Sequence, residues 1–142
     1  FAPLKGKPAP IEDAGIMICF EVIFPDLARE LSLKGATYLV NSSNDAWFKT
    51  WSTPEQHLEM SCFRAVENRR WLLSSTNHGY SAIIGPDGRI VREVGLLKEG
   101  WAMADIAPLR ELSFYTRFGP LVPAIWAGIS LIAALTAYRR KC

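Results

Sequence analysis

One cysteine in this sequence occupies a position suited to nucleophilic chemistry. Cys19 lies near the end of a short apolar run, residues 15–20 (GIMICF), and Glu21 follows two positions later. The run predicts a strand buried on both faces, and α/β proteins place reactive side chains at the ends of such strands. A thiolate at Cys19 could take the backbone amide of Phe20 as one donor to the oxyanion that it creates. A buried structural cysteine fits the same pattern.

Alternation along an extended chain would place Cys19 and Glu21 on the same side of the strand, if the strand continues that far. This geometry would bring a carboxylate close to the thiol. The pair is therefore the first candidate for a catalytic site in the sequence.

A second group of candidates lies in the loop of residues 44–53. Its aromatic residues, Trp47, Phe48 and Trp51, suit an acyl-chain entrance at a membrane surface, or the packing of the loop itself. Asn44 and Asp45 are residue types that shape turns through bonds from side chain to backbone, and substrate contact is the alternative for them.

The other polar residues indicate neither a metal nor a cofactor. Three cysteines at wide spacing argue against a disulfide framework, and no pair has the spacing of a zinc site. No metal-binding or phosphate-loop motif is present, so no cofactor is predicted. His57, near the start of a predicted helix, is expected to be structural rather than a base.

Length and composition favour one ordinary folded domain. The chain has 142 residues, of which 49% are hydrophobic and 21% are charged, so it can bury a core and is not disordered. The formal net charge of +2 is too small to predict a nucleic-acid partner.

The elements that must hold Cys19 follow an α/β pattern. A strand over 15–20, a helix over 25–34 and a strand over 38–42 predict a right-handed parallel βαβ unit. An antiparallel meander is expected afterwards, with a tight turn at residues 85–88 (GPDG). The later elements are a helix over 54–68, capped by Ser52 or Thr53, strands over 71–75, 80–84 and 90–93, and a last strand over 101–106.

The C-terminal segment predicts a membrane helix. Residues 121–138 (LVPAIWAGISLIAALTAY) carry no charge and precede the basic residues 139–141. This length suffices to cross a hydrocarbon core of ~30 Å, and the positive-inside rule places the basic tail in the cytoplasm. A hydrophobic helix packed on a soluble core is the alternative. We therefore divide the chain into a domain over 1–118 and a transmembrane helix with its tail over 119–142.

Several motifs resemble a known family. Residues 15–26 (GIMICFEVIFPD) are similar to the nucleophile segment of the nitrilase, or carbon–nitrogen hydrolase, superfamily. Within that superfamily, the order and spacing of six further motifs resemble the apolipoprotein N-acyltransferases. These motifs are NSSNDAWF at 41–48, QHL at 56–58, RAVE at 64–67, STNHG at 75–79, GPDGR at 85–89 and YTR at 115–117.

The resemblance implies a fold and a reaction. The fold would be the C-terminal part of a nitrilase-type αββα sandwich followed by one transmembrane helix, on the periplasmic side of the bacterial inner membrane. The reaction would move an acyl chain from a phospholipid to the N-terminal diacylglyceryl-cysteine of a lipoprotein, through a thioester. Cys19 matches the nucleophile and Glu21 a further acidic residue that assists. The residues expected to contact substrate are Phe20, Asn44, Trp47 and Phe48.

The sequence also departs from the family pattern. The family's catalytic Glu and Lys lie upstream of the nucleophile, before this chain begins, so a missing N-terminal part of the same protein is expected as a partner. Phe20 replaces the usual Tyr, and Lys5 and Lys7 are assigned no role. Two alternatives follow: a nitrilase-type amide hydrolase, and an inactive membrane-tethered fragment that binds lipid or lipoprotein without turnover.

Overall fold

Five strands form one mixed sheet in the order β1-β2-β3-β4-β5. The computed structural model describes residues 13–46, 52–119 and 121–139. Strands β1 (Ala14–Ile18), β2 (Tyr38–Ser43) and β3 (Trp71–Thr76) are parallel neighbours. Strands β4 (Ser81–Ile84) and β5 (Ile90–Val94) continue the sheet with antiparallel pairing. The predicted order of parallel strands followed by an antiparallel meander is therefore confirmed.

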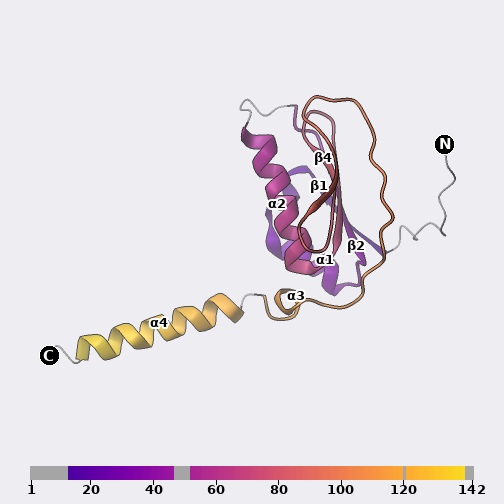
Figure 1. Cartoon of the computed structure of the whole chain (residues 1–142). Coiled ribbons are helices and arrows are strands. Elements are labelled where there is room, and N and C mark those ends of the chain that lie inside the picture. The colour runs from indigo at the N-terminus through magenta and orange to yellow at the C-terminus, as the bar shows by residue number, and fades with distance from the viewer. Residues whose placement is uncertain (1–12, 47–51, 120, 140–142) are drawn as a thin grey trace.

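Two helices cover one face of this sheet (Figure 1). Helix α1 (Pro25–Leu33) begins with Pro at its first turn, and Gly35 follows it with a φ of +104°, which a residue with a Cβ adopts only under strain. Helix α2 (Ser52–Asn68) packs beside α1. The side chains that are fully buried between helices and sheet include Met17, Val22, Ala28, Leu39, Ala65, Leu72 and Ile84.

The opposite face of the sheet is apolar and largely open. Ile16 and Ile18 on β1 are 54% and 65% exposed, and their neighbours Val40 on β2 and Leu73 on β3 are half-buried. Alternate residues of a strand point to opposite faces, so these side chains point away from α1 and α2. The prediction of a first strand buried on both faces is wrong for this chain, because no second layer covers β1 among the described residues.

The predicted strand over residues 101–106 does not form. Gly100, Trp101 and Ala102 line a shallow cavity together with residues of β3 and β4, so this segment crosses the sheet instead of extending it. Both of those strands already have hydrogen-bonded neighbours on each side, and they offer no free edge to a further strand. Trp101 remains 80% exposed.

Two helices end the described chain. Helix α3 (Phe114–Phe118) is capped by Ser113, whose side chain accepts a hydrogen bond from the amide of Thr116. Helix α4 (Leu121–Arg139) leads away from the sheet (Figure 1). Its exposed apolar side chains include Leu121, Ile125, Trp126, Ile129, Leu131 and Ile132.

The helix predicted over residues 121–138 is thus confirmed as a helix. Within the part of the chain that the structure describes, no helix combines the length and the apolar character needed to cross a membrane. The predicted crossing is therefore not confirmed.

Candidate active site

Cys19 lies at a sharp turn where β1 ends. The strand stops at Ile18, and residues Cys19–Ile23 form a short 3-10 helix, η2. Cys19 has a φ of +54°, a left-handed conformation that costs a residue with a Cβ roughly 1–2 kcal/mol. Such strain persists only where the surrounding structure enforces it, and it clusters at functional sites. The predicted strand over 15–20 therefore extends two residues past the end of β1, and strand alternation does not relate Cys19 to Glu21.

Glu21 reaches the turn in another way. Its Oε2 accepts a hydrogen bond of 2.7 Å from the backbone amide of Ile18, so the carboxylate folds back over the junction between β1 and η2. This bond satisfies an amide that would otherwise lack a partner at the start of η2. The structure thus gives Glu21 a role in shaping the turn, and its predicted part in the reaction stays a prediction.

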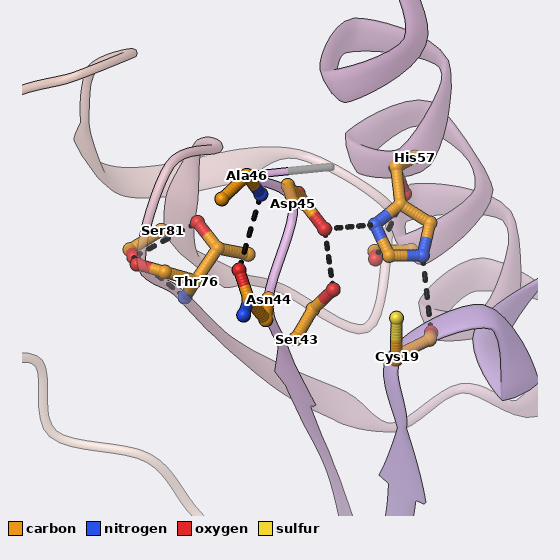
Figure 2. Close-up of polar contacts among 9 residues, drawn as sticks. Cys19, Ser43, Asn44, Asp45, Ala46, His57, Thr76 and Ser81 are labelled. Carbon is orange, nitrogen blue, oxygen red and sulfur yellow. Dashed lines mark hydrogen bonds and ion pairs between the residues drawn. The ribbon is translucent and has the colours of Figure 1, made fainter. Parts of the chain in front are cut away.

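A buried chain of polar groups lies beside Cys19 (Figure 2). The Nε2 atom of His57 lies 3.0 Å from the carbonyl oxygen of Cys19, and its Nδ1 atom lies 3.4 Å from Oδ1 of Asp45. The hydroxyl of Ser43 donates to the same Asp45 oxygen. The side chains of His57 and Asp45 are only 5% and 1% exposed. A carbonyl oxygen can only accept, so Nε2 of His57 carries a proton and donates it.

Arg64 holds the other end of η2. Its Nη1 donates to the carbonyl oxygen of Ile23 at 3.1 Å, and its remaining nitrogens form a two-point pair with the Glu67 carboxylate at 2.9 and 3.0 Å. Burial raises the pKa of Glu67, and the charge of Arg64 opposes that rise. His57 and Arg64 lie two turns apart on one face of α2. One helix therefore binds the first and the last carbonyl of the turn that carries Cys19.

The other predicted site residues divide into three kinds. Phe20 is 49% exposed beside Cys19 and meets Phe24 edge to face, with ring centroids 6.0 Å apart. Asn44 is exposed, and its Oδ1 accepts from the amide of Ala46 at 3.1 Å, which is the turn-shaping bond anticipated for it. Trp47 and Phe48 lie outside the described residues.

Sequence reasoning missed the part that His57 and Asp45 play together. Each was considered alone, because a residue pattern does not show that the loop after β2 and the start of α2 meet under the end of β1. The available signal was a Ser-x-Asp sequence directly after one parallel strand, followed by a His in the first turns of the next helix. Since parallel strands end at the same edge of a sheet, Asp45 and His57 could have been placed together near Cys19.

Cys19 and Cys62 are both free thiols. Cys62 lies half-buried on α2, where burial, and secondarily the charge of Glu59, raise the pKa of its thiol. In residues 13–46, 52–119 and 121–139, no three His, Cys, Asp or Glu side chains gather as metal ligands.

Comparisons with known proteins give the family. The carbon–nitrogen hydrolase family model matches residues 4–111. A protein from Geobacter metallireducens named apolipoprotein N-acyltransferase is 43% identical over 128 residues, which is 89% of this chain and 24% of that protein. A Pseudomonas aeruginosa protein of the same name is 37% identical over 118 residues, or 83% of this chain and 23% of its own length. The chain thus spans about a quarter of the length of these curated relatives.

Solved structures agree with this result. Nit3 from Saccharomyces cerevisiae, a member of the nitrilase superfamily, matches with a TM-score of 0.53 and 28% identity, over 61% of this chain and 34% of its own. A carbon–nitrogen hydrolase from Helicobacter pylori shares the fold, with a TM-score of 0.55 at 19% identity, over 61% of this chain and 37% of its own. The resemblance to apolipoprotein N-acyltransferases is confirmed by relatives of that name, and the chain belongs to the carbon–nitrogen hydrolase family, with a nitrilase-type α/β fold built on a mixed sheet.

Proposed function

We propose that this chain is the nucleophile-bearing C-terminal part of an apolipoprotein N-acyltransferase, with Cys19 as the acyl carrier. The observation that carries the proposal is the strained turn at Cys19. It lies at the end of a parallel strand and is held by hydrogen bonds from side chains of α2. The name of relatives such as the Geobacter protein, 43% identical to this chain, supports the choice of reaction within the family.

In the first step, the Cys19 thiolate attacks the ester carbonyl carbon of a phospholipid. A carbon–sulfur bond forms and the ester carbon–oxygen bond breaks, so that a thioester and a lysophospholipid result. The thiol proton passes to a general base and from there to the leaving alkoxide. The amide of Phe20, directly after the nucleophile, donates to the oxyanion that develops on the carbonyl oxygen.

In the second step, the α-amino group of the lipid-modified N-terminal cysteine of a lipoprotein attacks the thioester. A carbon–nitrogen bond forms, the carbon–sulfur bond breaks, and the Cys19 thiol is regenerated. The general base is a Glu, and a Lys supports the oxyanion, both from a segment upstream of this chain. Support for such a segment comes from the family resemblance, and from the length of the relatives, of which this chain covers about a quarter.

The upstream segment also has a surface to cover. The open face of β1 presents Ile16 and Ile18, and a contiguous apolar face of a sheet is stable only when another layer packs on it. We assign that layer to the missing N-terminal part of the same protein, which would complete the αββα sandwich.

Substrate contacts follow from the same reading. Phe20 places an exposed apolar ring next to the thiol, which suits an acyl chain. Glu21 assists at the turn, and Asn44, Trp47 and Phe48 come from the loop that follows β2. The exposed apolar side chains of α4 suit attachment to the bacterial inner membrane, with the Cys19 domain on the periplasmic side.

Covalent trapping tests this function. The full-length protein that contains this chain is prepared in membranes and given a phospholipid with a labelled acyl chain, and label on each cysteine is measured by mass spectrometry. The 142-residue chain and a Cys19→Ala variant are run beside it, with Cys62 as the internal comparison. We expect hydroxylamine-labile label on Cys19 of the full-length protein, none on Cys62, and none on the short chain.

Other outcomes have definite meanings. Label on the short chain would show that the upstream Glu and Lys are not needed. An unlabelled, folded full-length protein that hydrolyses small amides would replace the acyltransferase with the nitrilase-type amide hydrolase.

A further inference from the structure

We propose that His57, oriented by Asp45, is a positioning residue that holds the backbone of Cys19 in its left-handed conformation. This proposal rests on the proposed role of Cys19 as nucleophile. It concerns the backbone of Cys19 and assigns His57 no proton transfer with the thiol, because the Nε2 atom faces the Cys19 carbonyl oxygen at 3.0 Å.

The energetics of the turn require such a partner. A φ of +54° is strained for a residue with a Cβ, and a relaxed φ at Cys19 would carry its side chain away from the end of β1. A hydrogen bond from an imidazole to the Cys19 carbonyl contributes a stabilisation of the same order as this strain, and more if the donor is charged. The His57 bond is therefore of the right size to offset the strain.

The donor itself is fixed in direction. The ring of His57 is buried, and its Nδ1 atom lies 3.4 Å from Asp45, whose Oδ1 also accepts from Ser43. A ring held at one nitrogen presents the other nitrogen in one direction, which is how a second partner orients a histidine. Gly79 approaches Asp45 so closely that a Cβ there would overlap the Asp45 carboxylate.

The two side chains of α2 that hold η2 have different roles. Arg64 binds the carbonyl of Ile23, at a point where the backbone is not left-handed. Both side chains hold the same short helix on α2, yet only His57 contacts the residue that carries the thiol. Loss of His57 is therefore expected to change the reactivity of Cys19 specifically.

The test measures the chemical reactivity of the thiol apart from acyl transfer. In the full-length protein, the rates of alkylation of Cys19 and Cys62 by iodoacetamide are followed in the same samples by mass spectrometry, beside thioester formation. The variants are His57→Ala, His57→Gln and Asp45→Asn. The matched control is His78→Ala, which removes the chain's other histidine from an exposed loop.

We expect His57→Ala to slow both alkylation of Cys19 and thioester formation by at least about tenfold, since small misplacements of a reacting group cost up to ~10²-fold. His57→Gln keeps an N–H donor at similar reach and should restore most of the rate. Asp45→Asn should give an intermediate loss. Alkylation of Cys62 should be unchanged in all variants, and His78→Ala should match the unaltered protein.

Two results would overturn the proposal. One is unchanged alkylation and acylation of Cys19 in His57→Ala. The other is a loss in His57→Gln as large as in His57→Ala, because the donated hydrogen bond would then not be the cause. If Cys19 alkylation follows the expected order while no thioester forms in the unaltered protein, the positioning role stands and the acyltransferase function fails.

Discussion

Each end of helix α2 buries a cluster of polar groups. One cluster contacts the residue that carries the candidate nucleophile, and the other does not. At the first end, His57 joins Asp45 to the carbonyl of Cys19. At the last end, Asn68 bonds to Thr116 of α3, and Arg70 follows, 1% exposed, with its guanidinium donating to backbone carbonyls. The second cluster joins segments that are distant in the sequence. The first ends on a strained residue whose thiol stays available.

The cluster around Arg70 therefore supports the fold, and the cluster around His57 supports the candidate active site. The donors of Arg70 go to carbonyl oxygens of Ala36, Asn68, Arg69 and Glu111, so the cluster ties the start of β2 and the segment before α3 to the end of α2. Burial lowers the pKa of the Arg70 guanidinium, and these carbonyls replace the water that it has lost. A polar network of this kind stabilises the fold. The network beside Cys19 instead stabilises the left-handed conformation of that one residue.

Removal of the thiol should give the largest effect. Cys19→Ala is expected to abolish thioester formation and to lower acyl transfer by about 10³-fold or more, because no other group in the turn can carry the acyl chain. Acyl transfer by the full-length protein is the measurement, and the apparent melting temperature should change little. Cys62→Ala is the matched control and should remain active. Substantial acyl transfer by Cys19→Ala would show that Cys19 is not the acyl carrier, and the His57 cluster would then have no role in the reaction.

Disruption of the second cluster should act on stability instead. Arg70→Met leaves four backbone carbonyls without their donor, and we expect a loss of about 3 kcal/mol in the free energy of unfolding. Chemical denaturation of the full-length protein is the measurement. Arg92→Met is the control, since Arg92 is exposed and, among the described residues, its side chain donates only to the adjacent Val91 carbonyl. A change within about 0.5 kcal/mol is expected. A fully stable Arg70→Met protein would contradict the architectural role.

Gly79 offers a smaller change that should affect the first cluster only. A Cβ at this position would overlap Oδ2 of Asp45 and lie 3.0 Å from both Asp45 Cγ and Thr76 Oγ1. Gly79→Ala should therefore displace the partner of His57 and cost about 1–3 kcal/mol, with slower alkylation of Cys19. Gly95→Ala is a suitable control, because the nearest atoms to its Cβ would be those of the flexible Lys98 side chain, at 3.6 Å or more. Equal behaviour of the two variants would show that the Asp45 contact is unimportant.

The smallest expected effect concerns the thiol that lies between the clusters. Burial raises the pKa of Cys62, so at a given mildly alkaline pH it forms less thiolate in the folded protein than in the unfolded chain. The unfolded chain loses this proton first, so stability should decline slightly as the pH rises from the unfolded towards the folded pKa. Alkylation of Cys62 against pH, with and without denaturant, measures the shift. Glu59→Gln should lower the pKa only in part, since burial is the larger cause, and coincident curves would contradict the shift.

Most of the fold was predictable from local patterns in the sequence. The apolar runs, Pro25 and the GPDG turn gave the order of strands and helices up to β5, because each of these signals acts within a few residues. The strand over 101–106 was wrong because its alternating pattern carries no information about free sheet edges. The exact end of β1 was also missed, since a left-handed φ at Cys19 depends on bonds from α2, a segment that comes much later in the chain.

The candidate site was predicted in part. Cys19 stood out by its residue type at the end of an apolar run, and the turn-forming role of Asn44 followed from its chemistry. The pairing of Asp45 with His57 was not found, because it arises only when two loops meet at the edge of the sheet. Contacts of that kind depend on tertiary packing and leave only a weak trace in one sequence.

The bonds around Glu67 and Asn68 connect the turn that carries the thiol to α3. Arg64 joins Ile23 to Glu67, Ser113 donates to the Glu67 carbonyl, and Thr116 donates to Asn68, so the Cys19 turn and α3 are both attached to α2. Helix α4 follows α3 directly in the chain order. The turn that carries the thiol and α3, the last element before α4 in the chain, are therefore held in one arrangement through α2.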